Sequence, residues 1–126
     1  ILICPTIAAQ VGAAAALQVG RAHVAPHVAS LRAVRDLVRD ELGALAPKVV
    51  VPAADGALYV LLRADSRLDP LRVAERLILE HRVAVIPGTA FGMDGCTFRV
   101  AYGALQRETV AEGIGRLVTG LRAVLG

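Results

Sequence analysis

Aromatic side chains are scarce in this sequence: tryptophan is absent, and two tyrosines and two phenylalanines make up 3% of its 126 residues. Hydrophobic residues nevertheless reach 56%, so a core must be built from alanine, valine, leucine and isoleucine. Four aromatic rings offer little for stacking nucleic-acid bases, and the basic residues never form a run of four. The net charge of +3 is therefore explained by solvated helix faces, and we expect no nucleic-acid partner.

Cysteine and lysine are rarer still. The two cysteines, Cys4 and Cys96, lie far apart and form neither a disulfide framework nor a zinc pattern. We expect both to be reduced, buried thiols of a cytoplasmic protein. Lys48 is the only lysine among fourteen basic residues, and we expect it to be a solvated residue at the end of a strand.

Histidine gives no metal or triad pattern. His23 and His27 are four residues apart, but Pro26 lies between them and argues against a shared helical face. No acidic third ligand lies near this pair in the sequence, and we expect all three histidines, including His81, to be surface or helix-end residues. We therefore expect no metal site.

No hydrophobic run is long enough to cross a membrane. The longest, from Ile7 to Val19, is interrupted by Gln10 and Gln18, falls short of the roughly 20 residues that a span requires and follows no basic leader. The chain begins at Ile1 without methionine, and its mean hydropathy is +0.59. Of two interpretations, a compact alanine-rich domain or a piece of a longer polypeptide with a covered apolar surface, we favour the second.

Helical signals occupy both ends and the middle of the chain. After a short apolar run at residues 1–3, Thr6 can cap a helix that continues to Val19 and stops at Gly20. A connector over residues 21–26 precedes a second helix over 27–45, with an apolar stripe of Val28, Leu31, Val34, Val38, Leu42 and Leu45. Asp69-Pro70 starts a third helix that runs to His81, with Leu71, Ala74, Leu77 and Ile78 as its stripe. A fourth spans 107–125, with Val110, Ile114, Leu117, Leu121 and Val124 at steps of four and three.

Strand signals fall between these helices. The runs 48–51 and 57–62 predict an antiparallel hairpin with a five-residue loop, 52–56. Two more strands are predicted over 83–86 and 97–102. This order predicts an α+β fold, in which helices cover one face of a small, largely antiparallel sheet.

One charge interrupts these apolar strands. The run Val83 to Gly92 ends in a Pro-Gly turn and a glycine-bounded loop, and the next run, Phe98 to Gly103, carries Arg99 in its middle. A buried charge is costly without a partner, and the planar guanidinium suits a carboxylate. The alternative is a structural arginine that reaches solvent at a strand end or pairs with Asp94.

These two motifs resemble a known family. The pattern V-A-V-I-P-G-x-A-F-G followed by F-R-V-A-Y-G is similar to the C-terminal small domain of class I and II, fold-type-I pyridoxal-phosphate-dependent aminotransferases of the aspartate aminotransferase type. The likeness extends through Ile3-Cys4-Pro5 with Gln10, through residues 55–59, and into the last helix. The resemblance implies that residues 1–30 are a remnant of the large cofactor-binding domain and that residues 31–126 are the small C-terminal domain.

The resemblance also assigns roles. Arg99 is expected to hold the substrate α-carboxylate, and the loop with Gly88 and Phe91 to border the active site; Phe98 and Tyr102 are expected to pack around Arg99. The sequence around Lys48 does not match the Schiff-base segment of the family. We therefore expect no catalytic or cofactor-binding residue in this chain, and no activity from the chain alone.

For the full-length parent, the resemblance implies a homodimeric pyridoxal-phosphate enzyme. It would move an amino group between an amino acid and a 2-oxo acid, with the missing N-terminal large domain as partner and residues 1–20 at the subunit interface. Two alternatives remain open: a stand-alone α+β module that binds amino acids or partners without catalysis, and a lyase or synthase of the same fold.

Overall fold

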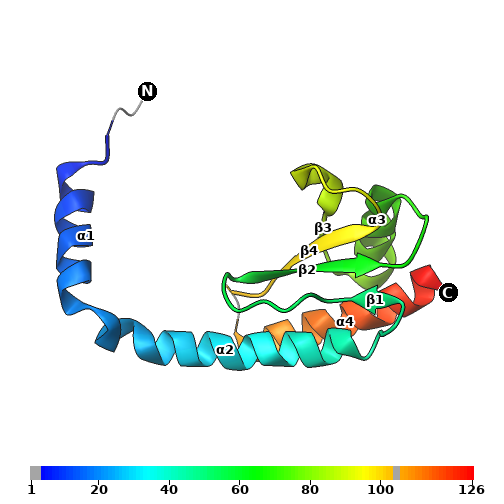
Figure 1. Cartoon of the computed structure of the whole chain (residues 1–126), viewed down its shortest axis with the longest axis horizontal. Helices are drawn as coiled ribbons and strands as arrows, with labels where there is room; N and C mark the ends of the chain where they lie inside the picture. The colour runs from blue at the N-terminus through cyan, green and yellow to red at the C-terminus, as the bar shows by residue number, and fades with distance from the viewer. Residues whose placement is uncertain (1–3, 104–105) are drawn as a thin grey trace. The chain divides into compact units, whose positions relative to one another are not determined.

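The computed structural model describes residues 4–103 and 106–126, so the apolar run 1–3 lies outside the described residues. The chain forms two compact units, residues 1–32 and residues 33–126 (Figure 1).

The first unit begins with helix α1 (Ile7–Val19), as predicted. The Thr6 hydroxyl accepts a hydrogen bond from the backbone N–H of Ala9 at 3.3 Å and so caps the helix start. Gly20 has φ +70°, a conformation that glycine adopts without a side-chain penalty, and it ends the helix. No residue of α1 is buried.

Helix α2 (Arg21–Gly43) starts directly after Gly20, so the predicted connector over residues 21–26 is wrong. Pro26 lies inside the helix, because its fixed φ suits a helical backbone and only one N–H donor is lost near the helix start. His23 and His27 consequently share a face, with ring centroids 5.6 Å apart, contrary to the expectation that the proline separates them. Among the described residues, no group of three or more possible metal-ligating side chains occurs.

The second unit contains a four-stranded sheet in the order β1-β2-β4-β3, and every pairing is antiparallel. Its strands are β1 (Val49–Val50), β2 (Tyr59–Ala64), β3 (Ile86–Pro87) and β4 (Thr97–Ala101). Helices α3 (Pro70–His81) and α4 (Arg107–Leu125) complete the unit together with the second half of α2. The predicted α+β class is confirmed.

Strands β2 and β3 start two and three residues later than predicted. β2 begins at Tyr59 instead of residue 57, because Ala57 has φ +64° and cannot be extended. Residues 51–58 therefore connect β1 to β2, a longer loop than predicted. β3 begins at Ile86 instead of Val83, because the N–H of Val83 donates to Leu77 O at 3.2 Å and so closes the end of α3.

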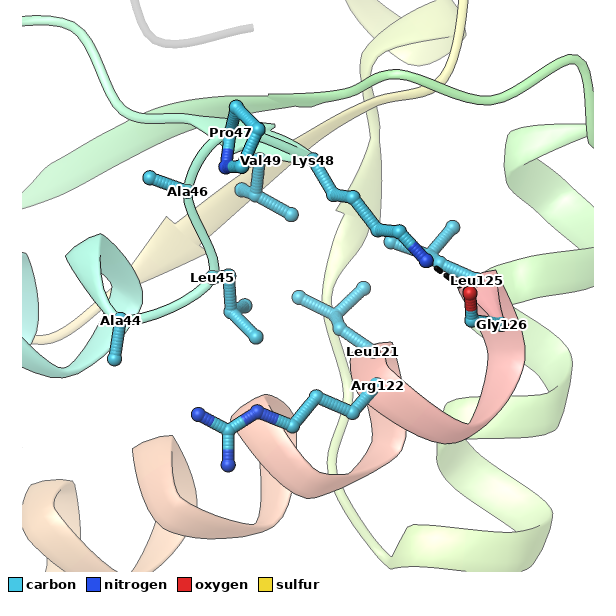
Figure 2. A pocket seen from close by; sticks show the side chains of 10 residues that line it. All are labelled: Ala44, Leu45, Ala46, Pro47, Lys48, Val49, Leu121, Arg122, Leu125 and Gly126. Carbon is cyan, nitrogen blue, oxygen red and sulfur yellow. Dashed lines mark hydrogen bonds between the residues drawn. The ribbon is translucent and has the colours of Figure 1, made fainter.

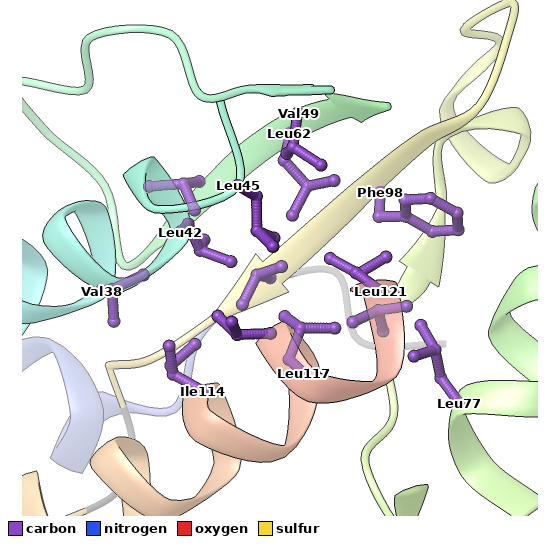
Figure 3. Packing of buried hydrophobic residues seen from close by; sticks show 14 of the residues in the cluster. Val38, Leu42, Leu45, Val49, Leu62, Leu77, Phe98, Ile114, Leu117 and Leu121 are labelled. Carbon is purple, nitrogen blue, oxygen red and sulfur yellow. The ribbon is translucent and has the colours of Figure 1, made fainter. Parts of the chain in front are cut away.

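The helices cover one face of this sheet (Figure 3). Along β2 the side chains alternate, with Val60, Leu62 and Ala64 buried and Tyr59 and Arg63 exposed. The predicted stripe of α4 is buried as a whole: Val110, Ile114, Leu117, Leu121 and Val124. In the described part of the chain, no helix is both long and apolar enough to cross a membrane.

The predicted first and last residues of α3 are confirmed, but the predicted set of buried side chains is partly wrong. The Asp69 carboxylate accepts from the N–H of Leu71 at 3.1 Å, and the helix ends at His81 as expected. Ala74 and Leu77 are buried, but Leu71 and Ile78 are 54% and 46% exposed. Val73 is buried instead, because the stripe that faces the core is rotated from the predicted one.

Val28 and Cys4, which were both predicted to be buried, are exposed in whole or in part. In α2, Val34, Val38 and Leu42 are buried, whereas Val28 is half-exposed. Cys96 is a buried free thiol as predicted, but Cys4 is exposed because it precedes a helix that buries none of its residues.

Candidate functional site

Arg99 lies in the middle of β4, on the sheet face that the helices leave open. Its strand neighbours are Leu61 in β2 and Ile86 in β3. Side chains alternate along a strand, so Phe98 and Val100 enter the core while Arg99 points the other way. The arginine is half-buried.

Two aromatic rings contact the Arg99 guanidinium. Its central carbon lies 4.7 Å from the centre of the Phe91 ring and 5.3 Å from the centre of the Tyr59 ring. Both distances are within the range of cation–π attraction, about 6 Å. The Nε atom is buried and has no hydrogen-bond partner among the described residues.

The prediction that Phe98 and Tyr102 pack around Arg99 was wrong. Phe98 and Tyr102 are each 1% exposed and belong to the core, where the Tyr102 hydroxyl donates to Ala57 O at 3.3 Å. Within residues 4–103 and 106–126, no ion pair joins Arg99 to Asp94 or to another carboxylate. The charge therefore faces the open side of the sheet without an acidic partner in the described part of the chain.

Sequence reasoning missed Tyr59 as a neighbour of Arg99. Tyr59 pairs with Ala101, two residues beyond Arg99, so both side chains point to the same face of the sheet. The signal was present in the period of two along each strand, but the register of β2 against β4 was needed to use it.

The loop that carries Phe91 is a 3-10 turn, η1 (Gly88–Phe91). Gly88 is buried against Thr97 of β4, and its carbonyl oxygen accepts from the N–H of Met93 at 3.1 Å. Gly92 has φ +71° and ends the turn. Gly88 and Gly92, which bound this loop in the sequence, therefore allow a tight turn that brings Phe91 against Arg99.

Lys48 lies away from this pair of rings. It precedes β1, is exposed as predicted, and its ammonium donates to the carbonyl oxygen of Gly126 (Figure 2). It lines a cleft of about 340 Å³ between the α2–β1 connection and the end of α4. Leu121, a core residue on the covered side of the sheet, lines the same cleft.

This arrangement suits the recognition of an anion and not covalent chemistry. A guanidinium that rests on aromatic faces presents a planar fork, which matches the two oxygens of a carboxylate. Burial raises the pKa of the Cys96 thiol, with a smaller contribution from the negative charge of Asp69, so this buried sulfur stays protonated and is a poor nucleophile.

Comparison with known proteins gives a consistent result. The family model "Aminotransferase class I and II" matches residues 1–117. An aromatic aminotransferase of Arabidopsis thaliana is 34% identical over 124 residues, which are 98% of this chain and 31% of that protein. The chain thus spans about a third of the length of this relative.

Solved structures resemble the chain in the same way. An aspartate aminotransferase variant of Thermus thermophilus is 35% identical, with a TM-score of 0.68 over 80% of this chain and 27% of that one. The α-aminoadipate aminotransferase of Thermus thermophilus, solved with N-(5′-phosphopyridoxyl)-L-leucine, is 29% identical with a TM-score of 0.67. That match covers 76% of this chain and 25% of the solved one.

Proposed function

This chain belongs to the family of class I and II aminotransferases, and we propose that it is the carboxy-terminal part of an enzyme that moves an amino group between an amino acid and a 2-oxo acid. Arg99 holds the carboxylate of the substrate in this proposal. The observation that carries it is the half-buried Arg99 guanidinium, which rests on two rings and has no acidic partner among the described residues.

We also propose that the two units belong to different domains of the parent enzyme. Residues 31–126 are proposed as the small domain and residues 1–30 as part of a large domain; the division of the chain into units of 1–32 and 33–126 supports this assignment. Gly88 and Phe91 are proposed to border the substrate, because η1 brings the Phe91 ring to the guanidinium.

The family implies pyridoxal phosphate as the cofactor of the whole enzyme, and it supplies the electron sink for the chemistry. The residues of this chain do not fit that group. The only lysine, Lys48, is exposed and donates to Gly126 O, next to Leu121 on the covered side of the sheet. We therefore derive no catalytic step from this chain and propose that it is inactive by itself.

This inactivity is tested by mixing the 126-residue chain with pyridoxal phosphate and recording the absorbance spectrum. We expect no band of a lysine-bound cofactor beyond what free lysine gives. A strong band that disappears in Lys48→Arg would overturn the proposal.

The parent enzyme is also proposed to be a homodimer, with residues 1–20 at the subunit interface. The support is α1, which is apolar along most of its length and exposes Ile7 to 80% and Leu17 to 82%. Light scattering of the parent would measure its mass; a monomer at micromolar concentration would contradict this part. A cytoplasmic location stays a prediction from the sequence.

The role of Arg99 is tested in the parent enzyme by Arg99→Lys. Lysine keeps the charge but loses the planar fork, and hydrogen bonds to charged groups contribute about 1.5–3 kcal/mol each. We expect the loss of one such hydrogen bond to lower the apparent affinity for amino acids and oxo acids by about 10- to 150-fold. Arg67→Lys, at an exposed position in the loop before α3, is the matched control and should leave affinity unchanged. An Arg99→Lys enzyme with wild-type affinity would refute the carboxylate role.

A further inference from the structure

We propose that Tyr59 and Phe91 are positioning residues that hold the Arg99 guanidinium so that its two terminal nitrogens face a ligand carboxylate. The inference rests on the proposed carboxylate role of Arg99 and goes beyond it.

Two rings restrict the Arg99 guanidinium before a ligand binds. The guanidinium carbon lies 5.3 Å from the centre of the Tyr59 ring and 4.7 Å from the centre of the Phe91 ring. The rings come from different elements, β2 and η1. An arginine side chain has several rotatable bonds and loses much freedom when it binds. Two rings at these distances restrict that freedom before any ligand arrives, which lowers the cost of binding.

The buried Nε atom of Arg99 limits which edge of the guanidinium a ligand can reach. Nε is buried and finds no hydrogen-bond partner among the described residues. A ligand therefore cannot use the side edge of the guanidinium, which is formed by Nε and one terminal nitrogen. The end edge, with two terminal nitrogens, is the one left for a two-point contact with a carboxylate.

The backbone fixes the positions of both rings. Tyr59 pairs with Ala101 across the β2–β4 ladder, so its ring stays on the open face beside Arg99. Phe91 ends a turn in which Gly88 has no room for a side chain beside Thr97. Gly92, at φ +71°, then ends the turn. Both rings remain about half exposed, 44% and 47%, so neither serves the core.

Replacement of either ring by leucine keeps an apolar side chain and removes the π face. Because a cation–π contact changes an equilibrium by about 2- to 30-fold, we expect Tyr59→Leu and Phe91→Leu each to weaken carboxylate binding by this factor. Tyr59→Phe and Phe91→Tyr keep a ring and should stay within about 2-fold of the wild type.

The orientation of Arg99 is tested directly on the 126-residue chain by NMR. Ring currents from Tyr59 and Phe91 should shift the Arg99 side-chain protons upfield. The shift should shrink in Tyr59→Leu and in Phe91→Leu but persist in Tyr59→Phe. The Arg67 protons are the internal control, and backbone spectra verify that each variant is folded. Unchanged Arg99 shifts in both leucine variants would overturn the inference without any reference to activity.

The effect on binding is tested in the parent enzyme with a matched pair of ligands. One is the common amino acid on which the parent is most active; the other is the amine that lacks its carboxylate. Tyr59→Leu and Phe91→Leu should weaken binding of the amino acid by about 2- to 30-fold more than binding of the amine. Equal weakening of both ligands would mean a merely structural role and would contradict the inference.

The Arg99→Lys variant distinguishes the carboxylate-binding role of Arg99 from the positioning role of the two rings. If Arg99→Lys spares the amino acid, the carboxylate role itself fails. If Arg99→Lys weakens the amino acid but the leucine variants do not, the role of Arg99 stands and the positioning role of the rings is wrong.

Discussion

A Cβ atom added to Gly88 would lie 2.8 Å from Cβ of Thr97, and closer still to its hydroxyl oxygen. Thr97 is 2% exposed and belongs to β4, so it has little room to move. The absence of a side chain at Gly88 is therefore what lets the turn before Phe91 lie against the strand of Arg99.

Gly88→Ala is predicted to destabilise the chain by about 1–3 kcal/mol, because overpacking forces backbone shifts. Urea unfolding measures the effect, and the NMR shifts of Arg99 should change with it as Phe91 moves. Adding Thr97→Ala removes the hydroxyl clash but not the Cβ contact, so it should recover part of the loss. A Gly88→Ala protein with wild-type stability would mean that the turn adapts easily.

Alanine substitutions at the glycines of α4 are predicted to change the stability of the chain in opposite directions. A Cβ on Gly120 would lie 2.5 Å from Leu77 Cδ2 and 2.9 Å from His81 Cγ, both in α3. Gly120→Ala should therefore destabilise by about 1–3 kcal/mol, in spite of its better helix propensity. Gly113 and Gly115 have open space around them, so alanine there should stabilise by about 0.5–1 kcal/mol. Thermal unfolding of the three variants would contradict this view if all shifted in the same direction.

The start of α3 depends on a side-chain cap. The Asp69 carboxylate accepts from the N–H of Leu71, so Asp69→Ala should cost about 0.5–2 kcal/mol. Asp69→Asn keeps an acceptor oxygen and should lose much less. Asp65→Ala, an exposed position before the helix, is the control for a simple loss of charge. Equal losses in Asp69→Ala and Asp69→Asn would show that charge and not capping matters.

The pair Arg76–Glu80 on α3 predicts an NMR titration. A hydrogen bond from Arg76, at 2.8 Å to the Glu80 carboxylate, lowers the pKa of Glu80. Because the pKa is lower in the folded state, this pair stabilises the fold above the ordinary glutamate pKa and loses its effect as the pH falls through the lowered value. Arg76→Gln should raise the Glu80 midpoint, whereas Arg72→Gln, which removes the partner of Glu75, should not. An unchanged midpoint in Arg76→Gln would exclude the pairing.

The two thiols should react at very different rates. Cys4 is exposed, whereas Cys96 is 2% exposed and burial raises the pKa of its thiol. In a Cys4→Ser variant, a thiol reagent at neutral pH should modify Cys96 only as the protein unfolds, because the thiolate is the reactive form. Rapid labelling of the folded variant would contradict the burial of Cys96.

The sequence predicted the helices well where chemical signals mark their ends. Thr6, Asp69 and Gly20 mark helix boundaries that the structure keeps, because capping depends on local hydrogen bonds. The prediction failed at Pro26, where one lost hydrogen bond did not stop α2. It also failed at Ala57, whose positive φ no local pattern indicated.

Some residues of the candidate site could be predicted from local sequence signals, and others could not. The motif around Arg99, together with Gly88 and Phe91, was visible in the sequence, because a charge in an apolar strand and glycines at a turn are local signals. Tyr59 was not, since forty residues and the register of two strands separate it from Arg99. Phe98 and Tyr102, which lie within three residues of Arg99 in the sequence, proved to belong to the opposite side of the sheet.

By itself, then, the sequence determined the buried stripe of α4, the antiparallel α+β class and the position of one arginine in an apolar strand. These depend on period, capping and residue chemistry, which act over a few residues. Only the tertiary structure decided which rings contact Arg99 and why Gly88 carries no side chain. Those facts arise from strand register and close packing, which bring together residues that the chain keeps far apart.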